Sequence, residues 1–268
     1  METCIASVSV AGTLREKISA IASAGFDALE LYEPDLATAV ENPRDIAAMV
    51  TDRGLRLALL QPLRDFEGLP EPRRSQAFDA ARRMFDTMAG LGTDLLLVCS
   101  SVAQEADGDL TRIVEDISSL GEVASSYGMR IGFEALSWAR HIRDHRQAWD
   151  VVKRCNHPSI GLILDSFQTL VSGSGLASLS EIDGARVFHV QVADASNLDS
   201  DLLLLSRRHR QLPGEGNLDL NGFMTALRRS GYDGPCSVEL FRELPQQLPA
   251  PAESLRTLRA LIDHSLGK

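Results

Sequence analysis

Oxygen-bearing side chains stand at the ends of four short apolar runs, from the middle of the sequence onward. Glu134, Asp165, Gln191 and Glu239 each lie at the C-terminal end of a run rich in Val, Ile, Leu and Phe. Divalent cations such as Mn²⁺, Mg²⁺ and Co²⁺ favour shells of carboxylate, amide carbonyl and water oxygens. Three carboxylates in one dry pocket would repel one another, and a divalent cation would remove that penalty. These residues predict a metal site; the alternative is that a helix N-terminus or an arginine satisfies each acid separately.

The apolar runs that carry these residues belong to a pattern that spans the whole chain. Short apolar runs that alternate with helical patterns are typical of buried parallel strands. The expected strands cover residues 4–10, 27–32, 55–61, 94–100, 129–134, 159–165, 186–194 and 235–240. The expected helices cover residues 13–25, 35–53, 71–91, 109–127, 145–155, 219–230 and 252–265. A short, poorly defined helix follows the sixth strand, and residues 195–217 form the longest irregular segment.

Eight strand–helix units without a break in composition predict a (β/α)8 TIM barrel that forms one catalytic domain, residues 1–268. A doubly wound open sheet is the rival fold. It often carries a Gly-rich first turn between strand and helix, but the first turn here, SVSVAGTL, has no GxGxxG pattern. The candidate chemistry lies after strands five to eight, at the end of a barrel where active sites form, which favours the barrel.

Composition limits the classes of partner. The chain has 268 residues and a formal net charge of −10, which argues against nucleic acid because phosphate binding needs a basic surface. Four cysteines without a CxxC pair are typical of free thiols in a reducing compartment. No signal peptide or membrane span is visible, so we expect a cytoplasmic protein without a membrane partner. Homo-oligomerisation and a further domain both stay open.

Basic residues gather in two loops that are expected at the metal end of the barrel. Arg64 follows the third strand, and the segment 195–217 contains Ser206 and Arg210 within the stretch SRRHR. A guanidinium group binds a carboxylate through two hydrogen bonds, so such residues could capture a small anionic substrate in an otherwise acidic protein. The alternative is that these arginines face solvent.

Three histidines are candidates for the same region. His189 lies two residues before Gln191 and therefore on the same side of its strand. We interpret it as a histidine one layer deeper in the barrel, with metal ligation as the minority alternative. His141 and His145 lie in or beside the loop after the fifth strand, where either could transfer protons.

The arrangement resembles the xylose isomerase-like sugar isomerase/epimerase superfamily and, within it, the bacterial 3-dehydroshikimate dehydratases. The resemblance covers about residues 59–240 and is carried by the stretches LRDFEGLPEPRRSQAFD, LGTDLLLVCS, GFEALSWARHIRDH, GLILDSFQTL, VQVADA and SRRHRQLPGEG. It implies a TIM barrel with one divalent metal ion. The implied metal ligands are Glu134, Asp165, Gln191 and Glu239.

The resemblance also implies a reaction, which is loss of water from 3-dehydroshikimate through a metal-stabilised enolate to give protocatechuate in quinate/shikimate degradation. Arg64, Ser206 and Arg210 would then contact the substrate carboxylate or hydroxyls. The family commonly has His three residues after the metal-binding Asp, whereas this chain has Gln168. Because glutamine cannot exchange a proton near pH 7, proton transfer would fall to Glu134, His141, His145 or another group.

Other functions fit the same residues. A keto-sugar isomerase or epimerase would move a proton beside the same metal, and would turn over neutral sugars with little need for Arg64 or Arg210. A second alternative is a non-catalytic barrel that binds a metabolite, and Gln168 is the residue that best supports this hypothesis. An endonuclease of this superfold fits poorly, because the chain is acidic and has only six histidines for a site of several zinc ions.

Overall fold

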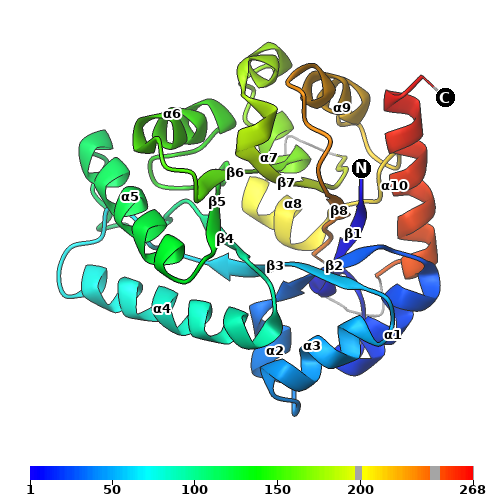
Figure 1. The fold of residues 1–268 in the computed structure, drawn as a ribbon. Coiled ribbons are helices and arrows are strands. Elements are labelled where there is room, and N and C mark those ends of the chain that lie inside the picture. Colours follow the sequence, from blue (N-terminus) through cyan, green and yellow to red (C-terminus); the bar gives the residue numbers. More distant parts are fainter. Residues whose placement is uncertain (197–200, 242–247, 268) are drawn as a thin grey trace.

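The computed structural model describes residues 1–196, 201–241 and 248–267. Eight parallel strands pair in sequence order and close on themselves, since β1 pairs with both β2 and β8 (Figure 1), which confirms the (β/α)8 barrel. The strands are β1 (Thr3–Ala6), β2 (Ala28–Tyr32), β3 (Arg56–Leu63), β4 (Leu95–Cys99), β5 (Arg130–Glu134), β6 (Ile160–Asp165), β7 (Val187–Val192) and β8 (Cys236–Val238). Every residue of β4 and β6 is buried, as expected for strands covered on both sides.

Helices surround the strands in Figure 1. The helices are α1 (Leu14–Ala24), α2 (Glu33–Ala37), α3 (Pro43–Thr51), α4 (Arg73–Leu91), α5 (Leu110–Ser126), α6 (His145–Cys155), α7 (Ser166–Val171), α8 (Leu202–Arg208), α9 (Leu220–Arg229) and α10 (Pro251–Ser265). Short 3-10 turns occur at η1 (Ser7–Ser9), η2 (Leu176–Glu181) and η3 (Gly184–Arg186). Among the described residues, no helix is both long and apolar enough to cross a membrane.

Two expectations from the sequence were wrong. The single helix expected over residues 35–53 is two helices, α2 and α3, because Pro43 can occupy only the first turn of a helix and Asn42 caps α3 by accepting the Asp45 backbone N–H at 3.0 Å. The segment 195–217, expected to be irregular, contains α8, which begins where Asp201 accepts the Leu204 backbone N–H at 2.8 Å.

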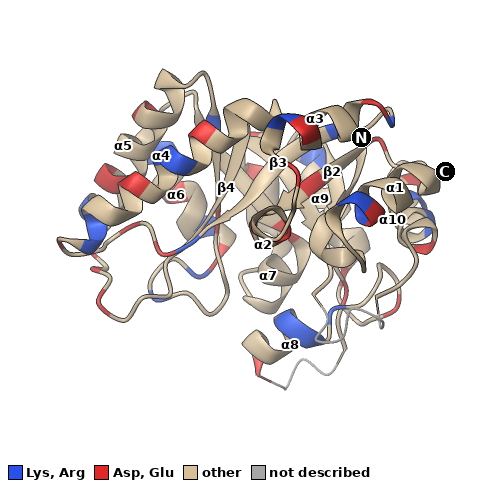
Figure 2. Cartoon of the chain, turned by 90° about the horizontal axis from the view of Figure 1, so that it is seen from below, with Lys and Arg blue, Asp and Glu red and all other residues tan. Residues whose placement is uncertain are grey.

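The segment that contains α8 leaves the barrel after β7 and is closed at its neck by Asp194. The backbones of Asp194 and Gln211 exchange hydrogen bonds of 2.9 and 2.8 Å as an antiparallel bridge. The buried Asp194 carboxylate also accepts the backbone N–H groups of Gly214 and Leu218, both at 3.0 Å. In Figure 2, α8 lies at one end of the barrel with basic residues on it. Asp194 therefore fixes where this basic segment meets the strands.

The loop after β3 is held in a similar way by α5. The buried Asp116 carboxylate accepts the backbone N–H of Gly68 at 2.9 Å and pairs with the Arg74 guanidinium at 2.7 Å. Asp65 accepts the Val102 backbone N–H at 2.9 Å, which ties this loop to the one after β4. These contacts place Arg64, which begins the loop, at the same end of the barrel as α8.

We expect Asp194→Ala to destabilise the protein by about 1–3 kcal/mol, because several backbone N–H groups lose a charged acceptor. The loss should be local, so the amides of residues 201–218 should exchange with solvent faster than the strands do. Thermal unfolding and hydrogen–deuterium exchange measure the two effects. Asp219→Ala, which removes the N-cap of α9, is the matched control and should leave exchange in residues 201–208 unchanged. Equal exchange of residues 201–208 in both variants would contradict the role of Asp194 in holding this segment.

Candidate active site

The structure brings the four oxygen-bearing residues together at the C-terminal end of the barrel strands. Glu134 ends β5, Asp165 ends β6, Gln191 lies near the end of β7, and Glu239 directly follows β8. Asp165 pairs in register with Gln191, and all four side chains are buried. The Gln191 amide nitrogen donates to Glu239 Oε1 at 3.1 Å. The alternation of the strands therefore directs all four side chains into the barrel interior.

Arg210 enters the same site from the segment after β7. Its side chain is 2% exposed, and its guanidinium group lies 2.7 Å from Asp165 Oδ2 and 2.8 Å from Glu239 Oε2. It also donates to the Ser206 hydroxyl at 3.1 Å and stacks over the Phe167 ring at 5.0 Å. Arg210 thus bridges two of the predicted metal ligands, a role that the sequence did not indicate.

The carboxyl groups of the site resist ionisation because they are buried. Burial raises the pKa of Glu134 well above its usual range, and the nearby Asp165 and Glu239 carboxyls add to this effect. Burial also raises the pKa of Asp165, and that of Glu239 to about 7, while the Arg210 guanidinium opposes both shifts. Because one guanidinium faces three carboxyls, ionisation of all three would leave negative charge that a further cation would neutralise.

The donor chemistry of the site fits an oxygen-preferring divalent cation. The side-chain oxygen of Gln191 is buried without a hydrogen-bond partner, and the other donors of the set are carboxylates. As the side chains stand, however, no three His, Cys, Asp or Glu residues in the described part of the chain converge closely enough to hold one ion. Arg210 lies between Asp165 and Glu239 instead, so metal binding would require it to withdraw from them.

Further arginines line a cavity at the mouth of the site. The cavity has a volume of about 20 Å³ and is bordered by Arg64, Arg207 and Arg210 together with Ser206 and Gln168. The pKa of Arg207 is lowered, first by burial and then by the positive charge of Arg64. Such a gathering of guanidinium groups favours an anion between them. The cavity has room for about one water molecule, so a larger ligand requires these long side chains to move.

Glu30, which the sequence reasoning did not single out, is fully buried in β2 beneath the carboxylates. It accepts hydrogen bonds from Gln61 at 2.8 Å, Gln191 at 2.7 Å and His189 at 2.8 Å, and also from the Ser237 hydroxyl. His189 is therefore engaged below the site, with its Nε2 on Glu30. A glutamate inside the otherwise apolar run of β2 was the available signal, because an acid is seldom fully buried without partners.

The residues expected at catalytic positions divide into two groups. Glu134 and Gln168 line the cavity, and Gln168 accepts the Ser137 backbone N–H at 2.9 Å. The His141 ring instead bonds the Ala106 carbonyl at 2.8 Å and does not border the cavity. His145 bonds the Ser178 hydroxyl at 2.7 Å, and burial lowers its pKa to about 4, so it is neutral near pH 7. The structure thus brings Glu134 into the site but not His141.

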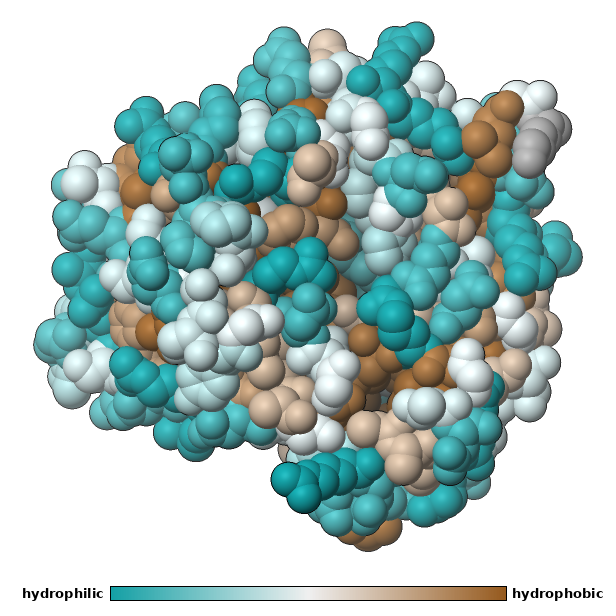
Figure 3. All heavy atoms as spheres, in the orientation of Figure 1, coloured by the Kyte–Doolittle hydropathy of each residue, from teal (hydrophilic) through white to brown (hydrophobic). Residues whose placement is uncertain are grey.

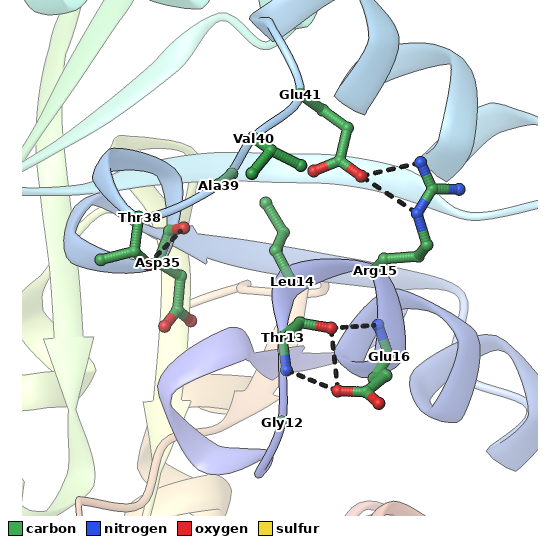
Figure 4. Close-up of a pocket in the computed structure, with 10 residues that line it drawn as sticks. All are labelled: Gly12, Thr13, Leu14, Arg15, Glu16, Asp35, Thr38, Ala39, Val40 and Glu41. Atoms are coloured by element: carbon green, nitrogen blue, oxygen red, sulfur yellow. Dashed lines mark hydrogen bonds and ion pairs between the residues drawn. The ribbon is translucent and has the colours of Figure 1, made fainter.

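A larger hollow of about 670 Å³ lies elsewhere, between the start of α1 and the connection from α2 to α3 (Figure 4). Its polar groups already have partners, since Arg15 pairs with Glu41 at 2.7 Å and Thr13 forms a capping box with Glu16. The surface in Figure 3 is mostly hydrophilic, with hydrophobic residues showing toward the middle of that face. The carboxylate site remains the better candidate, because it gathers buried carboxyl groups and the unpartnered Gln191 oxygen beside several arginines.

Glu67 is a buried acid in the loop that Arg64 begins. Its carboxylate accepts the Ser101 backbone N–H at 2.6 Å, while its second oxygen has no hydrogen-bond partner. Burial raises the pKa of Glu67 to about 8. This carboxyl group is therefore largely protonated in the folded protein at neutral pH, although it would be ionised in the unfolded chain.

Comparisons with known proteins point to one family. A family model described as xylose isomerase-like TIM barrel matches residues 18–261. A 3-dehydroshikimate dehydratase of Pseudomonas putida is 44% identical over 262 residues, which are 98% of this chain and 41% of that protein. A solved structure described as a xylose isomerase-like TIM barrel/4-hydroxyphenylpyruvate dioxygenase fusion protein has a TM-score of 0.96 at 43% identity, over 99% of this chain and 43% of that one. This chain therefore spans less than half the length of either protein.

A third comparison concerns the fold alone. A crystal structure of the IOLI protein with a binding zinc atom is 23% identical and has a TM-score of 0.87, with 99% of this chain and 98% of that chain covered. At this identity the likeness extends to the arrangement of strands and helices, and the zinc atom is a property of that protein.

We expect Glu67→Gln to stabilise the protein progressively as the pH rises from about 5 to 8. The folded-state pKa of Glu67, about 8, lies above its unfolded value. The stability that the protonated Glu67 contributes is therefore fully present below the unfolded pKa and is lost as the pH approaches 8. A neutral glutamine avoids this loss, so the gain at pH 8 should be on the order of 4 kcal/mol. Urea unfolding at several pH values measures it, with the exposed Glu71→Gln as control. A gain that does not depend on pH would contradict the raised pKa.

Proposed function

This chain belongs to the xylose isomerase-like TIM barrel family, and from that premise we propose that it is a divalent-metal-dependent dehydratase that converts 3-dehydroshikimate to protocatechuate. The observation that carries the proposal is the meeting of three buried carboxyls and the Gln191 oxygen with several arginines at one barrel mouth. The 44% identity to a protein named 3-dehydroshikimate dehydratase supports the same substrate. The match to the fusion protein covers 99% of this chain.

Glu134, Asp165, Gln191 and Glu239 would hold the metal ion, which we propose to be Mn²⁺, Mg²⁺ or Co²⁺. When bound, such an ion supplies a Lewis acid toward the ketone oxygen of the substrate. The carboxyl groups would be ionised by that charge, and the Gln191 oxygen would gain the partner that it lacks. Arg210 would exchange its contacts with Asp165 and Glu239 for contacts with the substrate.

The arginines at the mouth would bind the substrate carboxylate. Arg64 is exposed and Arg207 is half-buried, and both border the cavity beside the carboxylates. A carboxylate placed between them would relieve the repulsion that lowers the pKa of Arg207. Ser206, which now accepts from Arg210, would be available to a substrate hydroxyl. This arrangement favours an anionic substrate over a neutral keto sugar.

Loss of water requires removal of the proton beside the ketone and protonation of the departing hydroxyl. The C–H and C–O bonds break, a carbon–carbon double bond forms, and rearrangement of the remaining protons gives the aromatic ring. Glu134 is the group in the cavity that is suited to move these protons, because its carboxyl borders the cavity and can exchange a proton. Gln168 can orient the loop after β5 through Ser137, but it cannot exchange a proton.

The purified protein with Mn²⁺ should release protocatechuate from 3-dehydroshikimate, which its absorbance reports. Gln168→His should raise kcat by about tenfold or more, because a second proton-transfer group would border the cavity.

EDTA should abolish turnover, and Asp165→Asn should do so without unfolding the protein. Absence of product from both the wild type and Gln168→His, with each of the three metals, would remove the proposal. Turnover of neutral keto sugars in its place would favour an isomerase or epimerase.

We expect Arg64→Met to raise KM for 3-dehydroshikimate by roughly tenfold, because a charge-assisted hydrogen bond to the substrate carboxylate is lost at a site partly open to solvent. The effect on kcat should be smaller, since the contact is remote from the reacting carbons. Steady-state kinetics separate the two constants. Arg229→Met, on the exposed end of α9, is the matched control. An unchanged KM for Arg64→Met would place the substrate carboxylate elsewhere.

A further inference from the structure

We propose that Glu30 is a positioning residue that sets the direction of the Gln191 side-chain amide, so that Gln191 presents its oxygen to the metal site. The inference rests on the proposed metal site and concerns a residue outside it. Glu30 lies on β2, across the barrel interior from β7, and its side chain is fully buried. Its Oε2 lies 2.7 Å from the Gln191 amide nitrogen.

The chemistry of the two groups fixes this direction. An amide carries a donor end and an acceptor end of nearly equal shape, so its orientation is set by its neighbours. The Glu30 oxygens already accept from Gln61 and Ser237, so they face Gln191 as acceptors. The Gln191 nitrogen lies 2.7 Å from Glu30 and 3.1 Å from Glu239. A reversed amide would place its oxygen against the Glu30 acceptor, which is repulsive.

Glu30 itself cannot turn away, because donors from three strands hold it. Gln61 on β3 donates to the same oxygen that accepts from Gln191, at 2.8 Å. His189 on β7 and Ser237 on β8 contact the other oxygen. With its acceptor sites filled from several directions, the carboxylate forms a rigid base under Gln191. The consequence is that the Gln191 oxygen is buried without a partner on the side away from Glu30.

With Gln191 held in this direction, all four proposed metal ligands present oxygen atoms. A ligand set of three carboxylates and one amide oxygen suits Mg²⁺ and Mn²⁺, whereas an imidazole at the same position would favour zinc and similar ions. The Glu30 carboxylate would repel a carboxylate ligand at position 191, whereas it accepts a hydrogen bond from the amide of Gln191. Glu30 and Gln191 thus form a matched pair, in which one residue only accepts and the other must donate toward it.

The matched pair gives a reciprocal test by metal titration of the metal-free protein. Glu30→Gln keeps the shape but offers Gln191 a donor as well as an acceptor, so the amide direction is no longer fixed. Its Mn²⁺ affinity should fall by about 10–100-fold. Gln191→Glu alone places two carboxylates in contact and should also bind Mn²⁺ more weakly than the wild type, although glutamate is itself a good ligand. The double variant Glu30→Gln/Gln191→Glu restores donor against acceptor and should recover affinity to within about tenfold of the wild type.

Calorimetric titration with Mn²⁺ measures these affinities, and circular dichroism checks that each variant is folded. Ser254→Ala, at a buried serine on α10 outside the Glu30 network, is the control and is expected to change affinity less than threefold, a fraction of the effect that loss of a supporting contact typically has. Wild-type affinity in Glu30→Gln, or a double variant no better than either single one, would overturn the positioning role while leaving the metal site standing.

A second measurement needs no folded Glu30 variant and no metal. In ¹⁵N-labelled metal-free protein, the Gln191 side-chain NH₂ signal, assigned through its loss in Gln191→Met, should be shifted by hydrogen bonding and protected from exchange with solvent. A freely exchanging Gln191 NH₂ would overturn the inference. If the wild type binds no divalent ion while the NH₂ is protected, the proposed metal site fails but the fixed amide direction holds, so the two failures are distinguishable.

Discussion

The burial of three carboxyl groups together at the mouth of the barrel is the constraint on which the rest of this structure depends. Glu134, Asp165 and Glu239 reach that point because their strands end there, and burial raises the pKa of each of them. Such a cluster persists only with a cation beside it. Arg210 is that cation in this structure, at 2.7 Å from Asp165 and 2.8 Å from Glu239. The charge balance of the site therefore depends on this guanidinium group.

The polar layer below these carboxyl groups is organised by the same need of a buried acid for partners. A fully buried glutamate needs donors on every side, and Glu30 finds them on β3, β7 and β8. Because these donors come from separate strands, the network also ties opposite walls of the barrel together. This network orders the side chains directly below the carboxyl groups of the site. Most polar groups in this part of the barrel interior therefore have hydrogen-bond partners.

The positive charge, by contrast, comes from loops that carboxylates elsewhere hold in place. Asp194 closes the segment that delivers Ser206 and Arg210, through backbone contacts with Gly214 and Leu218. Asp116 anchors the loop that begins with Arg64. These anchors are buried acids that meet backbone N–H groups, so they fix the path of each loop through its backbone and not through its arginine side chains.

The sequence by itself determined the barrel and the four oxygen-bearing strand ends, because strand and helix periods are local patterns and a parallel barrel must place the C-terminal ends of its strands together. It missed the break before Pro43, where local turn chemistry outweighed a helical pattern. Only the tertiary structure decided that Arg210 lies between Asp165 and Glu239, that Glu30 supports Gln191, and that His141 turns to Ala106. These contacts join residues far apart in the chain, and their partners are chosen by packing across the barrel and between its loops, which no spacing along the sequence encodes.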